Sequence, residues 1–131
     1  MIGSVSPRML GLVARYADLW NVYFSTTRNS PDGVPPLREK VDAACLEAGR
    51  DPSTLGRTVA AYVDFTDTPG GTQSFNSSGA PALTGTPEEI AAGLRAYLDE
   101  GITHVQAHIL PMTADGIEAF APVLEALDRD A

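Results

Sequence analysis

Segments with helical periodicity alternate along this chain with short runs rich in β-branched and aromatic residues, and this alternation constrains the fold most strongly. The predicted strands are a stub at Met1 and Ile2 and longer runs at 19–24, 57–65 and 102–110. The predicted helices lie at 7–17, at about 36–48, from Thr86 to the stop at Gly101, and around 117–127. Such alternation is typical of a parallel sheet with right-handed helical crossovers.

Capping residues mark the boundaries of the predicted helices. Ser6 is a predicted N-cap, and Pro7 suits the first helical position. Thr86 and Glu89 form a predicted capping box before the third helix. Gly49 is predicted to end the second helix.

Two segments, 25–34 and 66–84, follow neither period and are predicted as loops. The second is long for a compact domain, and such loops are usually functional or mobile. In the last helix, Pro122 is predicted to interrupt or restart the helix. A small open α/β sheet and about half of a (β/α)8 barrel both fit this order, since 131 residues are too few for a complete barrel.

Composition bounds the class of protein. With 131 residues, of which 44% are hydrophobic and 20% charged, residues 1–131 are expected to form one globular domain. A net charge of -8 without a basic stripe disfavours binding to nucleic acid or to an anionic membrane. Neither a long apolar run nor a signal peptide is found, so the expected location is the cytoplasm.

Cys45 is the only cysteine, which excludes an intrachain disulfide. Its position on a predicted helix favours a small, buried hydrophobe over a catalytic thiol.

The first turn is the main candidate binding site. Gly3, Ser4, Val5 and Ser6 join the strand stub to a helix that begins at Pro7. Free backbone N–H groups and the positive end of a helix dipole favour an anion at such a turn. Two serine hydroxyls and the Arg8 side chain would assist, and a cofactor phosphate would fit. The alternative is a capped turn that binds nothing.

The last predicted strand alternates in polarity. His104, Gln106 and His108 share one face, and the residues between them share the other. In a barrel the polar face would line the lumen near its mouth, and His108 lies nearer that end. Four residues along a strand place the histidines roughly 13 Å apart, so no metal site is expected from them. Structural polar residues at an edge or in the lumen are the favoured interpretation.

Three aspartates lie at element ends. Asp18 follows the first helix, where an acid opposes the dipole, so a specific partner such as Arg15 is expected. Asp64 and Asp67 flank the end of the third strand, where catalytic groups often lie. A structural role in capping the following loop is favoured for both. The sequence contains no serine elbow, Walker loop or zinc-type cysteine pair, and no catalytic residue is assigned.

The stretch IGSVSPRMLGLVARYADLWN resembles a segment of the luciferase-like flavin-dependent monooxygenases and their deazaflavin (coenzyme F420) relatives. In that family a strand ends in a short glycine-rich turn, which is followed by a proline, a basic residue, an aliphatic helix and then Ala-Asp-Gly-Trp. The matching residues are Gly3, Pro7, Arg8, Leu10, Ala14, Arg15, Tyr16, Ala17, Asp18, Trp20 and Asn21. Residues 48–55, 84–106 and 120–128 also match, whereas 66–84 matches least.

The resemblance implies a (β/α)8 TIM barrel of which this chain forms about the C-terminal half, with three to four βα units. The chain would then start inside a barrel, through truncation, a mis-assigned start or a reduced gene. The resemblance also implies FMN or coenzyme F420 as cofactor, a small organic substrate, and cofactor phosphate at Gly3, Ser4, Val5, Ser6, Pro7 and Arg8. Two residues depart from the family pattern: Ser6 replaces a common glycine, and Leu19 replaces the glycine of Ala-Asp-Gly-Trp.

Two functions follow from these observations. The first is a segment of a flavin- or F420-dependent oxidoreductase that keeps part of the phosphate site. Because the strands that would complete the wall around the reactive ring lie upstream, activity of this chain alone is in question. The alternative is a catalytically inactive half-barrel whose open edges bind a second copy or a separate N-terminal half.

Overall fold

The computed structural model describes residues 1–67 and 76–129. Its strands are β1 (Ile2–Gly3), β2 (Leu19–Tyr23), β3 (Gly56–Asp64) and β4 (His104–Leu110). Its α-helices are α1 (Pro7–Tyr16), α2 (Phe24–Thr27), α3 (Pro35–Glu47), α4 (Pro87–Asp99) and α5 (Ala114–Arg129). Short 3-10 helices lie at η1 (Pro31–Gly33) and η2 (Pro52–Thr54). The predicted alternation of strands and helices is confirmed.

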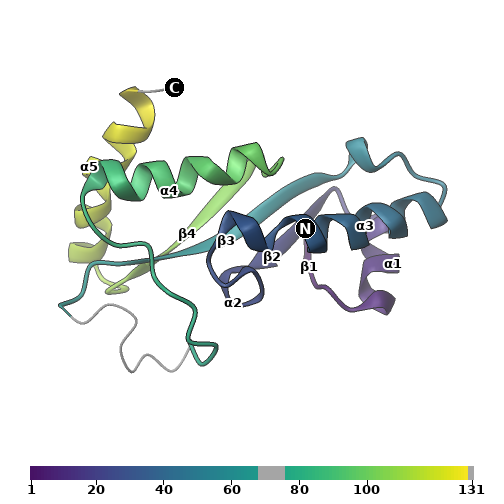
Figure 1. Ribbon diagram of the computed structural model, residues 1–131, viewed down its shortest axis with the longest axis horizontal. Coiled ribbons are helices and arrows are strands. Elements are labelled where there is room, and N and C mark those ends of the chain that lie inside the picture. The colour runs from purple at the N-terminus through teal and green to yellow at the C-terminus, as the bar shows by residue number, and fades with distance from the viewer. Residues whose placement is uncertain (68–75, 130–131) are drawn as a thin grey trace.

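The four strands form one parallel sheet in the order β1-β2-β3-β4. Gly3 pairs with Asn21, and Tyr23 pairs with Ala60, so the sheet is in register from β1 to β3. Figure 1 shows the strands side by side in chain order, with α1 and α3 at the β1 end and α4 and α5 at the β4 end. This sequential order is that of a barrel wall, because a doubly wound sheet reverses its strand order near the middle.

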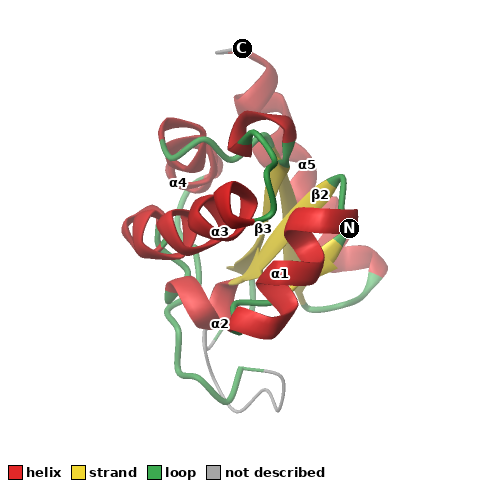
Figure 2. Ribbon diagram, turned by 90° about the vertical axis from the view of Figure 1, so that its right-hand side faces the viewer, coloured by secondary structure: helices red, strands yellow, loops and turns green. Residues whose placement is uncertain are grey.

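One face of the sheet carries the main hydrophobic core. Buried residues of α1, α3, α4 and α5 pack there against alternate strand residues, which include Trp20, Val22, Val59, Ala61 and Val63. Figure 2 shows α1, α3 and α4 following one another around the strands. Val105, Ala107 and Ile109 pack on this same face, so the predicted alternation of β4 is confirmed.

The opposite face is called the luminal face below. It carries Asn21 and Tyr23 of β2, Thr58 and Tyr62 of β3, and the polar residues of β4. Toward the C-terminal ends of the strands it carries a second, smaller core of Phe24, Tyr62, Ala80 and Leu110. Nearer the N-terminal end of β3, Thr58 is also fully buried on this face and donates a hydrogen bond of 2.7 Å to the Asn21 side chain. A polar luminal face and an apolar helical face are what a barrel wall requires.

Residues 25–34 are not the simple loop that the sequence predicts, because they contain most of α2 and all of η1. Asn29 explains why this segment is ordered. Its side chain donates 2.8 Å hydrogen bonds to the carbonyl oxygens of Tyr62 and Pro81, and accepts one of 2.8 Å from the Tyr62 N–H. The last residue of β3 that pairs with β2 is Ala60. The Asn29 amide thus supplies hydrogen-bond partners to the backbone of β3 beyond that point.

The last helix also differs from the prediction. It begins at Ala114, before the predicted start, and runs without a break through Pro122. Proline removes one helical hydrogen bond and disfavours an interior position. Phe120 and Val123, on either side of the proline, are buried in the core, so packing holds the helix together across it.

The predicted caps of α4 and α3 are confirmed. Thr86 Oγ1 accepts from the Glu89 N–H at 3.2 Å, and Glu89 Oε2 accepts from the Thr86 N–H at 2.8 Å. Gly49 has a φ of 72°, in the left-handed region, and the Arg50 N–H bonds the Cys45 carbonyl at 2.9 Å as in a Schellman motif. Cys45 is completely buried in the core, as expected of a small hydrophobe.

The Ser6 prediction is wrong in one respect. Ser6 occupies the N-cap position of α1 in an extended conformation, but its side chain makes no capping hydrogen bond to the helix. Its hydroxyl lies instead 3.4 Å from the Ser4 hydroxyl. The first turn of α1 therefore lacks the acceptor that a capping serine would supply.

The described part of the loop predicted at 66–84 returns to the sheet. Leu83 forms an isolated parallel bridge with Val63, and its backbone bonds both Tyr62 and Asp64. The Asp64 side chain accepts from the Thr66 N–H at 2.8 Å, so its predicted role in capping this loop is confirmed. Asp67 is exposed, and residues 68–75 of the predicted loop lie outside the described residues.

Candidate functional site

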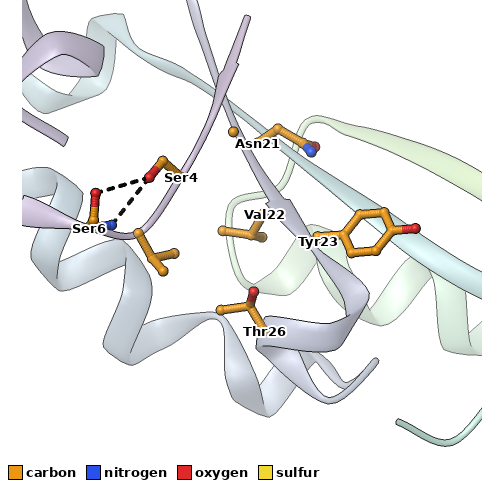
Figure 3. A pocket seen from close by; sticks show the side chains of 8 residues that line it. Ser4, Ser6, Asn21, Val22, Tyr23 and Thr26 are labelled. Atoms are coloured by element: carbon orange, nitrogen blue, oxygen red, sulfur yellow. Dashed lines mark hydrogen bonds between the residues drawn. The ribbon is translucent and has the colours of Figure 1, made fainter. Parts of the chain in front are cut away.

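A pocket of about 430 Å³ lies where β1 and β2 end at the C-terminal edge of the sheet. It is lined by Gly3, Ser4, Val5, Ser6, Asn21, Val22, Tyr23 and Thr26. Figure 3 shows the two serines on one side of the pocket and Val22, Tyr23 and Thr26 on the other. In parallel α/β proteins this edge of the sheet is where ligands bind.

The loop from Gly3 to Ser6 is held by hydrogen bonds to its own residues and to the core. The Ser6 N–H donates to Ser4 Oγ at 3.3 Å. The Ser4 carbonyl accepts a hydrogen bond of 2.8 Å from the indole N–H of Trp20, which is completely buried. The loop therefore has a fixed attachment to β2 immediately before α1 begins.

The start of α1 offers hydrogen-bond donors. Within the described residues, the backbone N–H groups of Val5, Arg8 and Met9 have no acceptor, whereas the Leu10 N–H bonds the Ser6 carbonyl at 2.9 Å. The first turn of α1 contains no acidic residue. Free N–H groups at the positive end of a ten-residue helix stabilise a bound anion.

Gly3 allows close approach to the loop. A Cβ atom built on it would lie 3.5 Å from the Asn21 carbonyl oxygen, which is an ordinary van der Waals contact. Its φ is not positive, so the fold of the loop does not demand glycine. A side chain at this position would extend into the pocket without straining the backbone.

The structure brings together only part of the predicted site. Gly3, Ser4, Val5 and Ser6 line the pocket, whereas Pro7 lines a separate groove between α1 and α3. Arg8 does not line the pocket; it is exposed on the first turn of α1. Its guanidinium forms no ion pair within the described residues.

Sequence reasoning missed the second wall of the pocket. Asn21, Val22 and Tyr23 come from the C-terminal end of β2, and Thr26 comes from α2. The signal that points to Asn21 and Tyr23 is the alternation of the run LWNVY, in which these two residues interrupt the apolar pattern. Thr26 gives no such signal because α2 was not predicted.

His108 lies on the luminal face, as predicted, beside residues of β2 and α2. Its Nδ1 is 3.3 Å from the Tyr23 hydroxyl, and its ring packs edge-on against Phe24 with centroids 5.9 Å apart. Tyr23 therefore connects the pocket at the first loop with the luminal residues of β4. No group of three or more potential metal ligands occurs in the described ranges, 1–67 and 76–129.

Asp18 has no side-chain partner in the part of the chain that the structure describes, so the expected pair with Arg15 is not formed. The free carbonyl groups at the C-terminal end of α1 are instead satisfied by Arg50. Its guanidinium donates to the carbonyl oxygens of Ala14 and Ala17, at 3.2 Å and 2.7 Å. The Arg50 guanidinium at the negative end of the helix dipole thus takes the place of the predicted pair between Asp18 and Arg15.

Two buried groups outside the pocket have raised pKa values. Burial raises the pKa of the Cys45 thiol, although Arg50 opposes this shift. Burial also raises the pKa of Tyr97 on α4, and the nearby Thr27 hydroxyl opposes the shift without forming a hydrogen bond of ordinary geometry. Both groups are therefore neutral at pH 7 and serve as core residues.

Comparison with known proteins gives structural matches only. No family model and no curated protein matches this chain. Among solved structures, the coenzyme F420 dependent tetrahydromethanopterin reductase from Methanopyrus kandleri matches with 15% identity and a TM-score of 0.67, over 98% of this chain and 49% of that one. An F420-dependent secondary alcohol dehydrogenase in complex with an F420-acetone adduct matches with 16% identity and a TM-score of 0.64, over 95% and 47%.

The sequential parallel sheet, its single helical face and these matches together decide the architecture. The fold is about half of a (β/α)8 barrel. This confirms the predicted fold class and excludes the small open α/β sheet. The chain spans about half the length of the solved structures that it matches. None of the helices in the described ranges has the length and apolar character needed to cross a membrane.

Proposed function

We propose that this half-barrel belongs to a cytoplasmic oxidoreductase of the luciferase-like class, and that the loop from Gly3 to Arg8 binds the phosphate of its cofactor. The observation that carries the proposal is the pocket at this loop, which Val5 and the serines Ser4 and Ser6 line. The start of α1 follows directly, and there the N–H groups of Arg8 and Met9, like that of Val5, have no acceptor among the described residues. Such a set of donors suits a phosphate better than an apolar or cationic group.

The residues of the pocket fit a phosphate-bearing cofactor. Backbone N–H groups of the loop and of α1 would hold the phosphate oxygens, with Ser4, Ser6 and Thr26 hydroxyls beside them. Arg8 would add long-range attraction from the helix surface. A flavin or deazaflavin supplies hydride transfer to or from a small organic substrate, and the protein supplies binding and positioning.

Coenzyme F420 is the first cofactor to test, because both solved structures named above are described as F420-dependent. FMN is the second, because the resemblance of the first loop extends to flavin-dependent enzymes. Both carry a phosphate, so the loop itself does not distinguish them. The residues that bind the ring system of the cofactor would distinguish F420 from FMN. In a complete barrel some of these residues come from the other half.

Equilibrium dialysis of the 131-residue protein against F420 and against FMN tests the proposal. We expect binding of one cofactor in the micromolar range and a loss of at least tenfold in affinity on Gly3→Val, because the new side chain enters the pocket. Gly11→Val is the matched control, since a Cβ at Gly11, also near the start of the chain, meets nothing within 4 Å. Absence of binding of both cofactors at high micromolar concentration would refute the proposal.

A second candidate function is assembly with another half-barrel. In the described residues β1 and β4 each pair on one side only, and Met112 and Ile117, which follow β4, are both 69% exposed. Unpaired strands beside exposed apolar side chains favour association. We propose a second copy of this chain as the occupant, with a separate N-terminal half as the other possible partner. A stable monomer in sedimentation velocity would exclude the second copy.

A further inference from the structure

We infer that Trp20 is the positioning residue of the phosphate loop, an inference that rests on the proposed function of that loop. Its indole N–H reaches from the core to the Ser4 carbonyl, 16 residues earlier in the chain, at 2.8 Å. Trp20 is fully buried among the residues that join the sheet to the helices. The loop is thereby attached to the main hydrophobic core.

Further hydrogen bonds connect Ser4 to the start of α1. Ser4 Oγ accepts from the Ser6 N–H at 3.3 Å, and the Ser6 carbonyl accepts from Leu10 at 2.9 Å as the first helical bond of α1. Trp20, Ser4, Ser6 and Leu10 therefore form one series of hydrogen-bonded residues from the core to the helix start. Any shift of the indole would move the loop relative to α1.

The Ser4 carbonyl, which accepts from the indole N–H, is also a potential acceptor for an N–H group of α1. In a helix the Ser4 carbonyl would accept from the N–H four residues later, which belongs to Arg8. Here the indole takes that carbonyl, and Ser6 is held in an extended conformation with φ -76° and ψ 143°. The helix begins at Pro7, because a residue that precedes proline disfavours the helical conformation, and the N–H groups of Arg8 and Met9 in its first turn stay available for an anion.

A buried tryptophan usually finds an acceptor for its N–H, so the bond alone would be consistent with simple core packing. The two roles differ in what ligand binding does to the indole. A positioning residue transmits the binding event, since its acceptor carbonyl belongs to the loop that contacts the anion. A packing residue would leave the indole signal unchanged by ligand.

Trp20 is the only tryptophan, so the protein gives one indole N–H signal in a ¹H–¹⁵N NMR spectrum. The probe is inorganic phosphate, titrated into the full chain. We expect the indole signal and the amide signals of Val5, Arg8 and Met9 to shift with one common Kd. Amide shifts without an indole shift would overturn the role of Trp20.

Replacement by two tryptophan analogues separates the hydrogen bond from the shape. β-(3-Benzothienyl)alanine keeps the bicyclic ring but lacks the N–H, and should weaken phosphate binding roughly three- to tenfold, as expected for one lost hydrogen bond. 5-Fluorotryptophan keeps the N–H and should restore wild-type affinity. Ile90→Val, in the core at α4, controls for a general loss of stability and should leave the Kd unchanged.

The outcomes distinguish this inference from the proposed function. If the wild-type amides of Val5, Arg8 and Met9 do not respond to phosphate or to either cofactor, the proposed function fails, and the inference falls with it. If they respond and the benzothienyl protein binds phosphate with the wild-type Kd, the phosphate loop stands and Trp20 is only a core residue.

Discussion

At the scale of single residues, Ser6 and Thr86 provide a direct comparison of two N-caps. Each is followed by proline, but only the Thr86 side chain accepts a helix N–H. We expect Thr86→Ala to lower the free energy of unfolding by about 1 kcal/mol, and Ser6→Ala to change it by less than about 0.5 kcal/mol. Urea denaturation measures both. An equal loss in the two variants would mean that Ser6 caps α1 after all, and that its hydroxyl is committed to the helix.

Cys45 gives a prediction about alkaline pH. Burial raises the pKa of its thiol above the ordinary value of 9.0, so the unfolded chain ionises first as pH rises. Well below pH 9 the thiol is protonated in both states, and the full stability is present. Stability is then lost as pH rises from 9 through the folded-state pKa. In Cys45→Ala the fall in free energy of unfolding between pH 8 and pH 10 should be smaller than in the wild type.

Tyr97 contributes a second loss of stability at alkaline pH, and a second variant separates it from that of Cys45. Tyr97 also has a raised pKa, from an ordinary value of 10.0, and its ionisation adds a further loss at higher pH. Tyr97→Phe should therefore flatten the stability profile above pH 10 and leave it unchanged near pH 9. Identical profiles for the wild type and Cys45→Ala would show that the thiol does not resist ionisation in the folded state.

At the scale of elements, Asn29 holds α2 and η1 against the end of β3. It is 4% exposed, has a φ of 54°, and makes three hydrogen bonds of 2.8 Å. Asn29→Ala would leave the buried Tyr62 N–H without an acceptor and keep a non-glycine residue in the left-handed region. We expect a loss of about 2–4 kcal/mol in urea denaturation. The neighbouring Arg28, with a φ of 56° but exposed, is the control, and Arg28→Ala should cost less than about 1 kcal/mol.

The elements also show what sequence patterns can and cannot predict. The order of strands and helices and the caps at Thr86 and Gly49 follow from local rules, and the structure confirms them. The segment 25–34 was mispredicted because its order depends on Asn29 reaching β3, a contact across 33 residues. Pro122 was mispredicted because burial on both sides of it outweighs one missing helical hydrogen bond.

The candidate site divides in the same way. Gly3, Ser4, Val5 and Ser6 are contiguous in sequence, so a turn before a helix was enough to predict their wall of the pocket. The other wall comes from β2 and α2, and only the parallel pairing of β1 with β2 brings it to the loop. The attachment through Trp20 has no local sequence signal, because its acceptor carbonyl lies in a different element.

At the scale of the whole molecule, the half-barrel exposes apolar side chains beside β4. Ile117 and Leu124 on α5 are 69% and 51% exposed. We expect the 131-residue protein to self-associate as its concentration rises, and to do so more strongly at high salt, because screening weakens the repulsion between chains of net charge -8. Replacing Ile117 and Leu124 together by glutamate should give a monomer at concentrations where the wild type sediments as a larger species.

Leu46→Glu is the matched control, since Leu46 on α3 is 68% exposed but lies away from β4, and this variant should still associate. Equal association of both variants would place the contact elsewhere on the surface, and a monomeric wild type at several hundred micromolar would show that the open edge of β4 does not bind a second copy.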